Sequence, residues 1–184
     1  MYRWLIAVLL VSLLTGCFKL PWALTPETEY IATEHNMAMT LPQGWMLSSR
    51  DDVVLLTRDG VLLQYVVVET IHVDNDLTNT KKHFKRNMLP LEQAEVILDN
   101  MSTSDNYTGF KVTKKAPAKV AGHQAFSAEY RFKDEDGLVY NGVMYGFMQN
   151  DWFYGVYYVA PKRHYFPRDK AKFEKLIKSI KLLV

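Results

Sequence analysis

Cysteine is nearly absent from the sequence, which holds a single one, Cys17, in 184 residues. One thiol cannot form an intramolecular disulfide, so the fold has to be stable through its hydrophobic core alone. A long apolar run is missing as well. The run Trp4–Leu14 rises about 16 Å as a helix at roughly 1.5 Å per residue, whereas a bilayer core is about 30 Å thick. This segment is therefore too short for a permanent membrane span.

Motifs of the common enzyme classes are missing too. There is no Gly-x-Ser-x-Gly nucleophile elbow, no phosphate-binding loop and no HExxH zinc motif. The histidines are scattered without a pair at helical spacing, namely His35, His72, His83, His123 and His164. A metal or catalytic site would need ligands that converge from distant segments, which the sequence leaves open. We expect no enzyme activity, no metal and no cofactor.

Charge of one sign is not in excess, since 22 Lys and Arg stand against 20 Asp and Glu. This balance argues against bulk electrostatic binding of nucleic acid. Repeats and low-complexity tracts are absent, and the chain after its N-terminal segment suits one domain with one core. The hydrophobic content of 48% and the 11 tyrosines predict an ordered body rich in strands.

The N-terminus has the pattern of an export signal, with Arg3 ahead of the apolar run. The run ends Leu14-Thr15-Gly16-Cys17, which resembles the lipobox of bacterial lipoproteins. The resemblance implies a diacylglycerol thioether on Cys17, cleavage before it, and usually a further acyl chain such as palmitate on the new amine. A free buried cysteine and a plain secretory signal cut elsewhere are the alternatives. An acylated Cys17 would also leave no thiol for Cys–His catalysis.

These features predict three segments: a signal peptide at residues 1–16, a lipidated tether at 17–34, and one domain at 35–184. Two or more acyl chains hold a protein firmly at a membrane, whereas one gives marginal binding. Phe18 rather than Asp follows the cysteine, which by resemblance to diderm lipoproteins favours the periplasmic side of the outer membrane. We therefore expect a domain that is lipid-anchored in the cell envelope.

The first half of the body alternates short strands and turns. Strands are predicted over 37–41 and 45–49, on either side of the turn Pro42-Gln43-Gly44. Two further strands are predicted over 53–57 and 61–71, and Asp59-Gly60 between them indicates a hairpin. The run 61–71 is almost continuously apolar, so that strand should be covered on both faces. A helix is predicted from Thr78 or Asn79 to Arg86, and apolar residues at helical spacing follow from Pro90, which indicates a second helix or one helix broken by Pro90.

The second half reads as an antiparallel meander that ends in a helix. Strands are predicted over 110–115, 121–133, 138–149 and 152–160, with turns at 134–137 and 150–151. Asp134–Gly137 looks like part of a calcium loop, but the later ligands are missing and a hairpin turn accounts for it better. A helix from Pro167 carries an apolar stripe, made of Phe173, Leu176, Ile177, Ile180 and Leu183. The predicted fold class is α+β, an antiparallel sheet with helices packed on it in a helix/sheet/helix sandwich.

Turn and packing residues along this body resemble the PsbP-like superfamily. They are Leu41-Pro42-Gln43-Gly44-Trp45, Val120-Ala121-Gly122-His123-Gln124-Ala125, Tyr157-Tyr158-Val159-Ala160-Pro161, and Leu176-Ile177-Lys178-Ser179-Ile180. That superfamily includes an extrinsic subunit of the oxygen-evolving complex, a Ran-binding import factor and DcrB-related envelope lipoproteins. The resemblance implies a PsbP-like fold and a structural or partner-binding role, and it supplies no catalytic residue.

Two surfaces are candidates for binding. Cations on and before the last helix are candidate membrane or partner contacts, namely Lys162, Arg163, Arg168, Lys172 and Lys175. A solvated helix face is the alternative. The aromatic run 152–158, with Tyr140 and Tyr145, either lines a ligand groove or fills the core, and core is favoured because a sandwiched sheet needs apolar cover on both faces.

Together these patterns favour a non-catalytic envelope lipoprotein whose domain binds another envelope protein or a lipid in an accessory or assembly role. The alternative is a small-ligand or metal-binding periplasmic module. A pocket with converging histidine and carboxylate groups would favour the alternative. A solid core with an exposed aromatic or basic patch would favour the first hypothesis.

Overall fold

A computed structural model describes residues 22–49 and 53–183. Its centre is an eight-stranded antiparallel sheet with the order β1-β4-β5-β6-β10-β9-β8-β7, and a second sheet has the order β11-β3-β2. The strands of the large sheet are β1 (Trp22–Leu24), β4 (Met46–Ser48), β5 (Val54–Thr57), β6 (Tyr65–His72), β7 (Thr108–Val120), β8 (His123–Lys133), β9 (Val139–Gln149) and β10 (Trp152–Pro161). Those of the small sheet are β2 (Tyr30–Ala32), β3 (Met37–Met39) and β11 (Lys181–Leu182).

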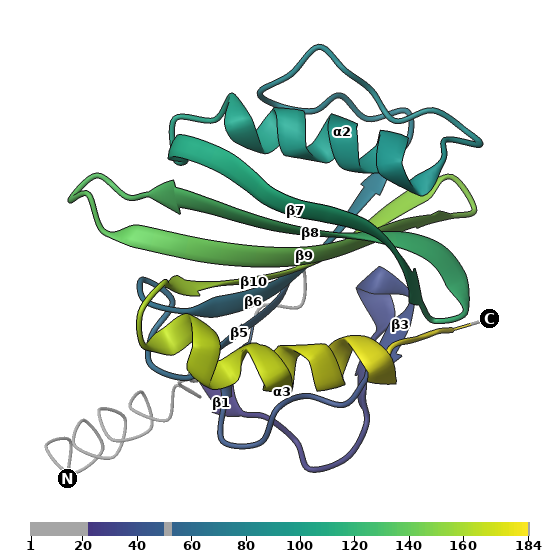
Figure 1. Ribbon diagram of the computed structural model, residues 1–184. Coiled ribbons are helices and arrows are strands. Elements are labelled where there is room, and N and C mark those ends of the chain that lie inside the picture. Colours follow the sequence, from purple (N-terminus) through teal and green to yellow (C-terminus); the bar gives the residue numbers. More distant parts are fainter. Residues whose placement is uncertain (1–21, 50–52, 184) are drawn as a thin grey trace, which may run out of the picture.

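The two helices cover opposite faces of the large sheet (Figure 1). Helix α2 (Pro90–Ser102) packs on β7, β8 and β9, and helix α3 (Tyr165–Ser179) packs on β10 and β9 from the other side. Two cores result, one around Phe173 and Trp45 under α3 and one around Ile97 and Phe126 under α2. The predicted helix/sheet/helix sandwich is confirmed.

The meander follows directly from its turn residues. Asn150 and Asp151 have φ angles of 48° and 64°, and Ala121 and Gly122 have 48° and 82°, so each pair forms a two-residue hairpin connection with both residues left-handed. The predicted turn at 134–137 lies between β8 and β9, where Gly137 has a φ of 80°. Four consecutive strands, β7 to β10, therefore pair in sequence order.

Part of the predicted tether pairs with the sheets. Residues 22–24 form β1 at the edge of the large sheet, where Trp22 pairs with Ser48 and Leu24 with Met46. The backbone of Thr25 donates to the carbonyl of Trp45 at 2.9 Å. Within the predicted tether 17–34, residues 22–24 thus form a strand of the large sheet and residues 30–32 form β2 of the small sheet. The predicted signal, Cys17 and Phe18 lie outside the described residues.

Residues 73–89 form an irregular connection instead of the predicted helix at 78–86. Phe84 is the one apolar side chain between Lys81 and Arg86, so this segment has no apolar stripe to bury as a helix. Instead, Phe84 stacks on Phe153 at a centroid distance of 4.4 Å. The backbone N–H of Asn79 donates to the side chain of Asn100 on α2 at 2.9 Å. The connection is fixed by these contacts with its neighbours.

Several element ends also differ from prediction, and β7, for example, covers Thr108–Val120 instead of 110–115. Residues 61–63 form a turn in which the N–H of Leu63 donates to the carbonyl of Gly60 at 3.0 Å, so β6 begins only at Tyr65. Helix α3 ends at Ser179, and Leu183 lies beyond it, next to the β11 strand. Within residues 22–49 and 53–183, no helix combines the length and apolar character needed to cross a membrane.

Candidate functional site: a tyrosine-lined pocket beside helix α2

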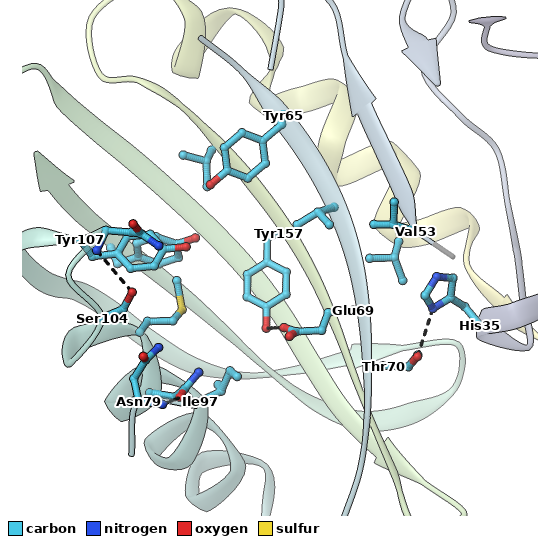
Figure 2. Close-up of a pocket in the computed structure, with 17 residues that line it drawn as sticks. His35, Val53, Tyr65, Glu69, Thr70, Asn79, Ile97, Ser104, Tyr107 and Tyr157 are labelled. Atoms are coloured by element: carbon cyan, nitrogen blue, oxygen red, sulfur yellow. Dashed lines mark hydrogen bonds between the residues drawn. The ribbon is translucent and has the colours of Figure 1, made fainter. Parts of the chain in front are cut away.

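The large sheet is wider than the helix that covers one of its faces. Strands lie about 4.8 Å apart and a helix with side chains is about 10–12 Å wide, so one helix covers only two or three strands. Because α2 lies over β7 to β9, the same face of β10 and β6 is left partly open beside it. A pocket of about 520 Å³ opens there (Figure 2).

The floor of the pocket comes from two neighbouring strands. Tyr65, Val67 and Glu69 alternate along β6 and so share one face, while Tyr157 and Val159 do the same on β10. Their opposite-facing neighbours, such as Val66 and Tyr158, belong to the core under α3. The strand pattern therefore sends these floor residues to the side that α2 leaves open, whereas Val68 and Thr70 line the pocket from the opposite face of β6.

Glu69 and Tyr157 are joined across the floor. The Tyr157 hydroxyl donates to Glu69 Oε2 at 2.8 Å, a contact visible in Figure 2. Gly155 lies opposite Glu69 in the register of β10 and β6. A Cβ on Gly155 would stand 2.7 Å from both Cε2 and the hydroxyl oxygen of Tyr157. The missing side chain thus leaves room for the Tyr157 ring to lie along β10 with its hydroxyl at Glu69.

Glu69 is an unusual residue for this position. Partial burial raises the pKa of its carboxyl above the ordinary value, and the hydrogen bond from Tyr157 lowers that pKa only in part. The residue is nevertheless exposed to solvent through the pocket mouth. Glu69 has no salt bridge with any Lys, Arg or His among the described residues. The pocket therefore presents a carboxylate without a cationic partner.

Three further tyrosines line the pocket from different elements: Tyr65 from β6, Tyr130 from β8 and Tyr107 from the segment before β7. Burial raises the pKa of all three phenols above the ordinary tyrosine value. Tyr130 is 1% exposed, and its hydroxyl finds no hydrogen-bond partner among the described residues. Buried polar atoms are rarely left unpaired, so this hydroxyl marks a site that the chain alone does not satisfy.

The walls combine apolar and amide groups. Ile97, Asn100 and Met101 project from α2, and Ser104 and Asn106 follow in the loop after it. Asn79 of the irregular connection also lines the pocket, and its backbone N–H donates to the side chain of Asn100 on α2. At the other end His35 lines the pocket, with Nδ1 3.1 Å from the hydroxyl of Thr70.

The predicted cationic contacts do not form one surface. Arg168 and Lys172 are both bound to Asp169, and Arg168 also pairs with Asp59. In contrast, Lys162, Arg163 and Lys175 are exposed and have no salt bridge within residues 22–49 and 53–183. Two of the five candidates thus hold the fold together, and three face solvent.

Asp169 is the centre of a buried polar cluster. Its carboxylate is 0% exposed and accepts from Arg58 at 3.1 Å, from Lys172 at 2.9 Å and from Gln64 at 2.9 Å, besides Arg168. Burial by itself would raise the pKa of Asp169, but the hydrogen bonds from Lys172, Gln64 and Arg168 outweigh it and keep the pKa far below the ordinary value. This cluster attaches α3 to the loop between β5 and β6.

The other sequence candidates are dispersed. The described residues contain no group of three or more His, Cys, Asp or Glu side chains that could hold a metal ion. Phe153, Tyr154, Tyr157 and Tyr158 of the aromatic run are buried, and only Tyr157 of this run lines the pocket. Trp152 is 40% exposed and packs edge-on against His72 with ring centroids 5.0 Å apart.

Sequence reasoning missed Glu69, Tyr65, Tyr107 and Tyr130 as a group. One signal was available, because Glu69 is the only charged residue in the apolar run 61–71 and a charge within a buried strand has to be explained. The convergence of the tyrosines could not be predicted from the sequence, because Tyr107 and Tyr130 reach the pocket from elements far away in the chain.

Comparisons with known proteins bear on the fold. Neither the models of known protein families nor the curated proteins give a match to the sequence. Among solved structures, cyanobacterial PsbP (CyanoP) from Synechocystis sp. PCC 6803 aligns over 92% of this chain and 98% of its own, with a TM-score of 0.58 and 12% identity. The fold is PsbP-like.

Two more structures share this PsbP-like fold. The Ran-binding protein Mog1p of Saccharomyces cerevisiae is 6% identical, with 86% of this chain and 96% of Mog1p covered and a TM-score of 0.57. A Pseudomonas aeruginosa protein of unknown function, PA94, described as a putative regulator, is 15% identical, with 82% and 93% covered and a TM-score of 0.50. Identities this low establish the fold alone.

Proposed function

We propose that this protein is a lipid-anchored, non-catalytic binding module of the cell envelope, in which the pocket beside α2 receives a group of another envelope component. The observation that carries the proposal is the convergence of Glu69 and four tyrosines on one concave, partly open stretch of the sheet. Pockets with a few converging polar groups and shifted pKa values are the usual binding sites of globular domains.

The phenols of the pocket are better suited to binding than to proton transfer, whereas burial moves the pKa of Glu69 upward, toward neutrality. A general acid or base works best when its pKa lies near the working pH. Burial moves the pKa of Tyr65, Tyr107, Tyr130 and Tyr157 upward, away from neutrality. Neutral phenols at these positions serve as fixed hydrogen-bond donors, acceptors and aromatic walls.

The lipid anchor is proposed from Cys17 and its lipobox-like surroundings. Since Trp22 already pairs in the sheet, at most residues 17–21 would separate the lipid from it, a span of no more than about 18 Å. Such a short connection would hold the β1 edge of the sheet close to the membrane. Phe18 after the cysteine favours the outer membrane of a diderm host.

The experiment is site-specific photo-crosslinking in cells. A photoreactive amino acid replaces Asn106, which is exposed at the pocket rim, and in a matched control it replaces Gln43, which is exposed in the β3–β4 turn. We expect Asn106 to capture a defined envelope component and Gln43 not to. Equal capture at both positions, or none at Asn106, would refute a binding role for the pocket.

Anchoring is tested separately with Cys17→Ser in the full chain. We expect this variant to remain unprocessed and to incorporate no labelled palmitate, whereas the unmodified chain is processed and labelled. Normal processing and normal membrane fractionation of Cys17→Ser would refute the lipid anchor. The crosslinking result at the pocket does not depend on this outcome.

A second contact is favoured by one end of the sheet. Leu62 is 90% exposed and Leu138 is 45% exposed. The Tyr140 hydroxyl donates to the backbone carbonyl of Leu62 at 2.9 Å, and the backbone N–H of Lys162 donates to the carbonyl of Val139 at 2.9 Å. The segments that carry Leu62, Val139 and Lys162 therefore meet at this end of the sheet. Exposed leucines beside cations suit an anionic lipid surface. We propose that this end contacts the bilayer.

A further inference from the structure

We propose that the group bound by the pocket is an organic ammonium cation, with Glu69 as its counter-charge and the tyrosine rings as its enclosure. This inference rests on the proposed function of the pocket as a binding site and adds the chemical class of the ligand. It follows from the charges, the rings and the unpaired hydroxyl that meet there.

The charge of the pocket is one-sided. Among its lining residues, Glu69 is the only acid, His35 is the only basic side chain, and no lysine or arginine takes part. A carboxylate in a partly enclosed site is costly unless a cation or hydrogen-bond donors compensate it, and among the described residues only Tyr157 does so. A cationic ligand supplies the missing charge, whereas an anionic ligand would be repelled.

The rings provide the second part of the site. Tyr65, Tyr107 and Tyr157 enter the pocket from three different elements. Phenol faces attract ammonium groups by about 0.5–2 kcal/mol each, and several of them around one cation form an aromatic enclosure. The unpaired Tyr130 hydroxyl adds an electronegative oxygen to the same lining. Such a lining matches a cation better than a neutral apolar group.

The site does not suit a bare divalent metal ion. Calcium and magnesium take six or more oxygen ligands, usually from several carboxylates, whereas the pocket holds one carboxylate. An ammonium group needs only one counter-charge together with weak acceptors and ring faces. The volume of about 520 Å³ leaves room for the ammonium group and for the part of the ligand that carries it.

The test compares choline with its uncharged isostere 3,3-dimethylbutan-1-ol. The full chain is purified in a non-ionic detergent and labelled with ¹³C at the methionine methyl groups. Met101 lines the pocket and reports binding, while Met37 lies in the core under α3 and reports that the protein is folded. We expect choline to shift the Met101 signal with saturation, and the isostere to bind at least tenfold more weakly.

Variants then separate charge from structure. Glu69→Gln keeps the size of the side chain and should weaken choline binding at least tenfold, with the Met37 signal unchanged. Glu95→Gln is the matched control, because Glu95 is exposed on α2 and pairs with Lys115. This control should bind choline like the unmodified chain.

Three outcomes would overturn the inference. They are equal binding of choline and its isostere, retention of choline affinity in Glu69→Gln, and no Met101 shift with either ligand. In the first two cases the pocket still binds ligands. The proposed binding function then stands, and only the inference of a cationic ligand held by Glu69 is wrong. In the third, crosslinking at Asn106 decides the proposed function independently.

Discussion

The hydroxyl of Tyr157 on β10 donates to the carboxylate of Glu69 on the neighbouring strand β6, at 2.8 Å. This one bond holds an otherwise uncompensated acid in place on the open face of the sheet. It requires that Gly155, which lies opposite Glu69, carries no side chain. A cluster that only stabilised the sheet would not need a carboxylate, because a neutral acceptor on β6 would also pair with the Tyr157 hydroxyl.

Replacing Glu69 should therefore stabilise the protein. Because partial burial raises the pKa of Glu69, keeping it ionised costs stability once the pH exceeds that raised pKa, and the cost disappears below the ordinary glutamate pKa. We expect Glu69→Gln to unfold at a higher urea concentration than the unmodified chain at pH 7, with the difference shrinking toward pH 4. A lower midpoint for Glu69→Gln at pH 7 would contradict this account.

The titratable groups near Glu69 affect how the pH series is interpreted. Tyr65, Tyr107, Tyr130 and Tyr157 face it with raised pKa values and stay neutral from pH 4 to 7. His35 is the one basic side chain among the lining residues of the pocket. His35→Gln combined with each Glu69 form removes its contribution, and the pH-dependent difference should persist.

Gly155→Ala should disturb the pocket through Tyr157. The new methyl would stand 2.7 Å from the Tyr157 ring, which is 6% exposed and has little space to move. Overpacking of this kind typically costs about 1–3 kcal/mol. We expect urea unfolding to show a loss of this size in the free energy of unfolding, and we expect the pocket to bind its ligand more weakly. Gly155→Ala with Tyr157→Leu removes the clash, so the double variant should recover part of the stability while the contact with Glu69 stays lost.

Asp169→Asn should expose the structural role of the buried cluster. The carboxylate is 0% exposed, and its loss leaves Arg58, Arg168 and Lys172 without their shared counter-charge. Breaking a buried ion pair on one side costs about 3–5 kcal/mol, and partial exposure of the cations places the expectation near 3 kcal/mol. Chemical denaturation measures this loss in the free energy of unfolding.

The same variant tests the acid response. Hydrogen bonds from Lys172, Gln64 and Arg168 outweigh burial and depress the pKa of Asp169, so its stabilisation is present above the ordinary aspartate pKa and is lost as the pH falls below it. The unmodified chain should therefore lose stability between about pH 4 and pH 2, and Asp169→Asn should lose less over that range. Parallel pH profiles would show that Asp169 is not the group responsible.

Phe84→Ala should loosen the irregular connection at 73–89. Phe84 is 3% exposed and stacks on Phe153, and removing a buried phenylalanine costs about 3–5 kcal/mol. Since few other apolar side chains hold this connection, part of the effect should appear as local opening. Hydrogen exchange should speed up at the amide of Asn79 more than at Val156 in the sheet. Equal acceleration at both would indicate global unfolding instead.

Strand positions, the meander and the two covering faces were predictable because they depend on local signals. Alternating apolar residues and turn pairs such as Asn150-Asp151 specify hairpins within about 30 residues of chain. The wrong predictions concern segments whose structure depends on contacts with residues far away in the sequence. Trp22–Leu24 becomes a strand only because β4 offers an unpaired edge, and Thr78–Arg86 avoids a helix because α2 and Phe153 supply its partners.

The candidate site was less predictable than the fold for the same reason. Arg168 and Lys172 look like free cations in sequence, but both form ion pairs with the buried Asp169. Tyr130 reads as a core residue, and its position in the pocket depends on Gly142 on the next strand, where a Cβ would stand 2.2 Å from the Tyr130 ring. Such pairings across strands require the register, which the sequence pattern gives only approximately.

The basic end of the sheet offers the last prediction. Lys162 and Arg163 are exposed without salt bridges in the described part of the chain, next to Leu138, whereas Arg168 is held by Asp59 and Asp169. With an environment-sensitive fluorescent amino acid at position 138 and the full chain reconstituted in vesicles, anionic lipid should shift the emission to the blue at low salt. Exposed cations contribute about 1 kcal/mol each at an anionic surface, and salt screens them. Lys162→Gln with Arg163→Gln should abolish the shift without changing stability, whereas Arg168→Gln should lower stability and keep the shift. If emission is the same in neutral and anionic vesicles at low salt, this end of the sheet does not contact anionic lipid.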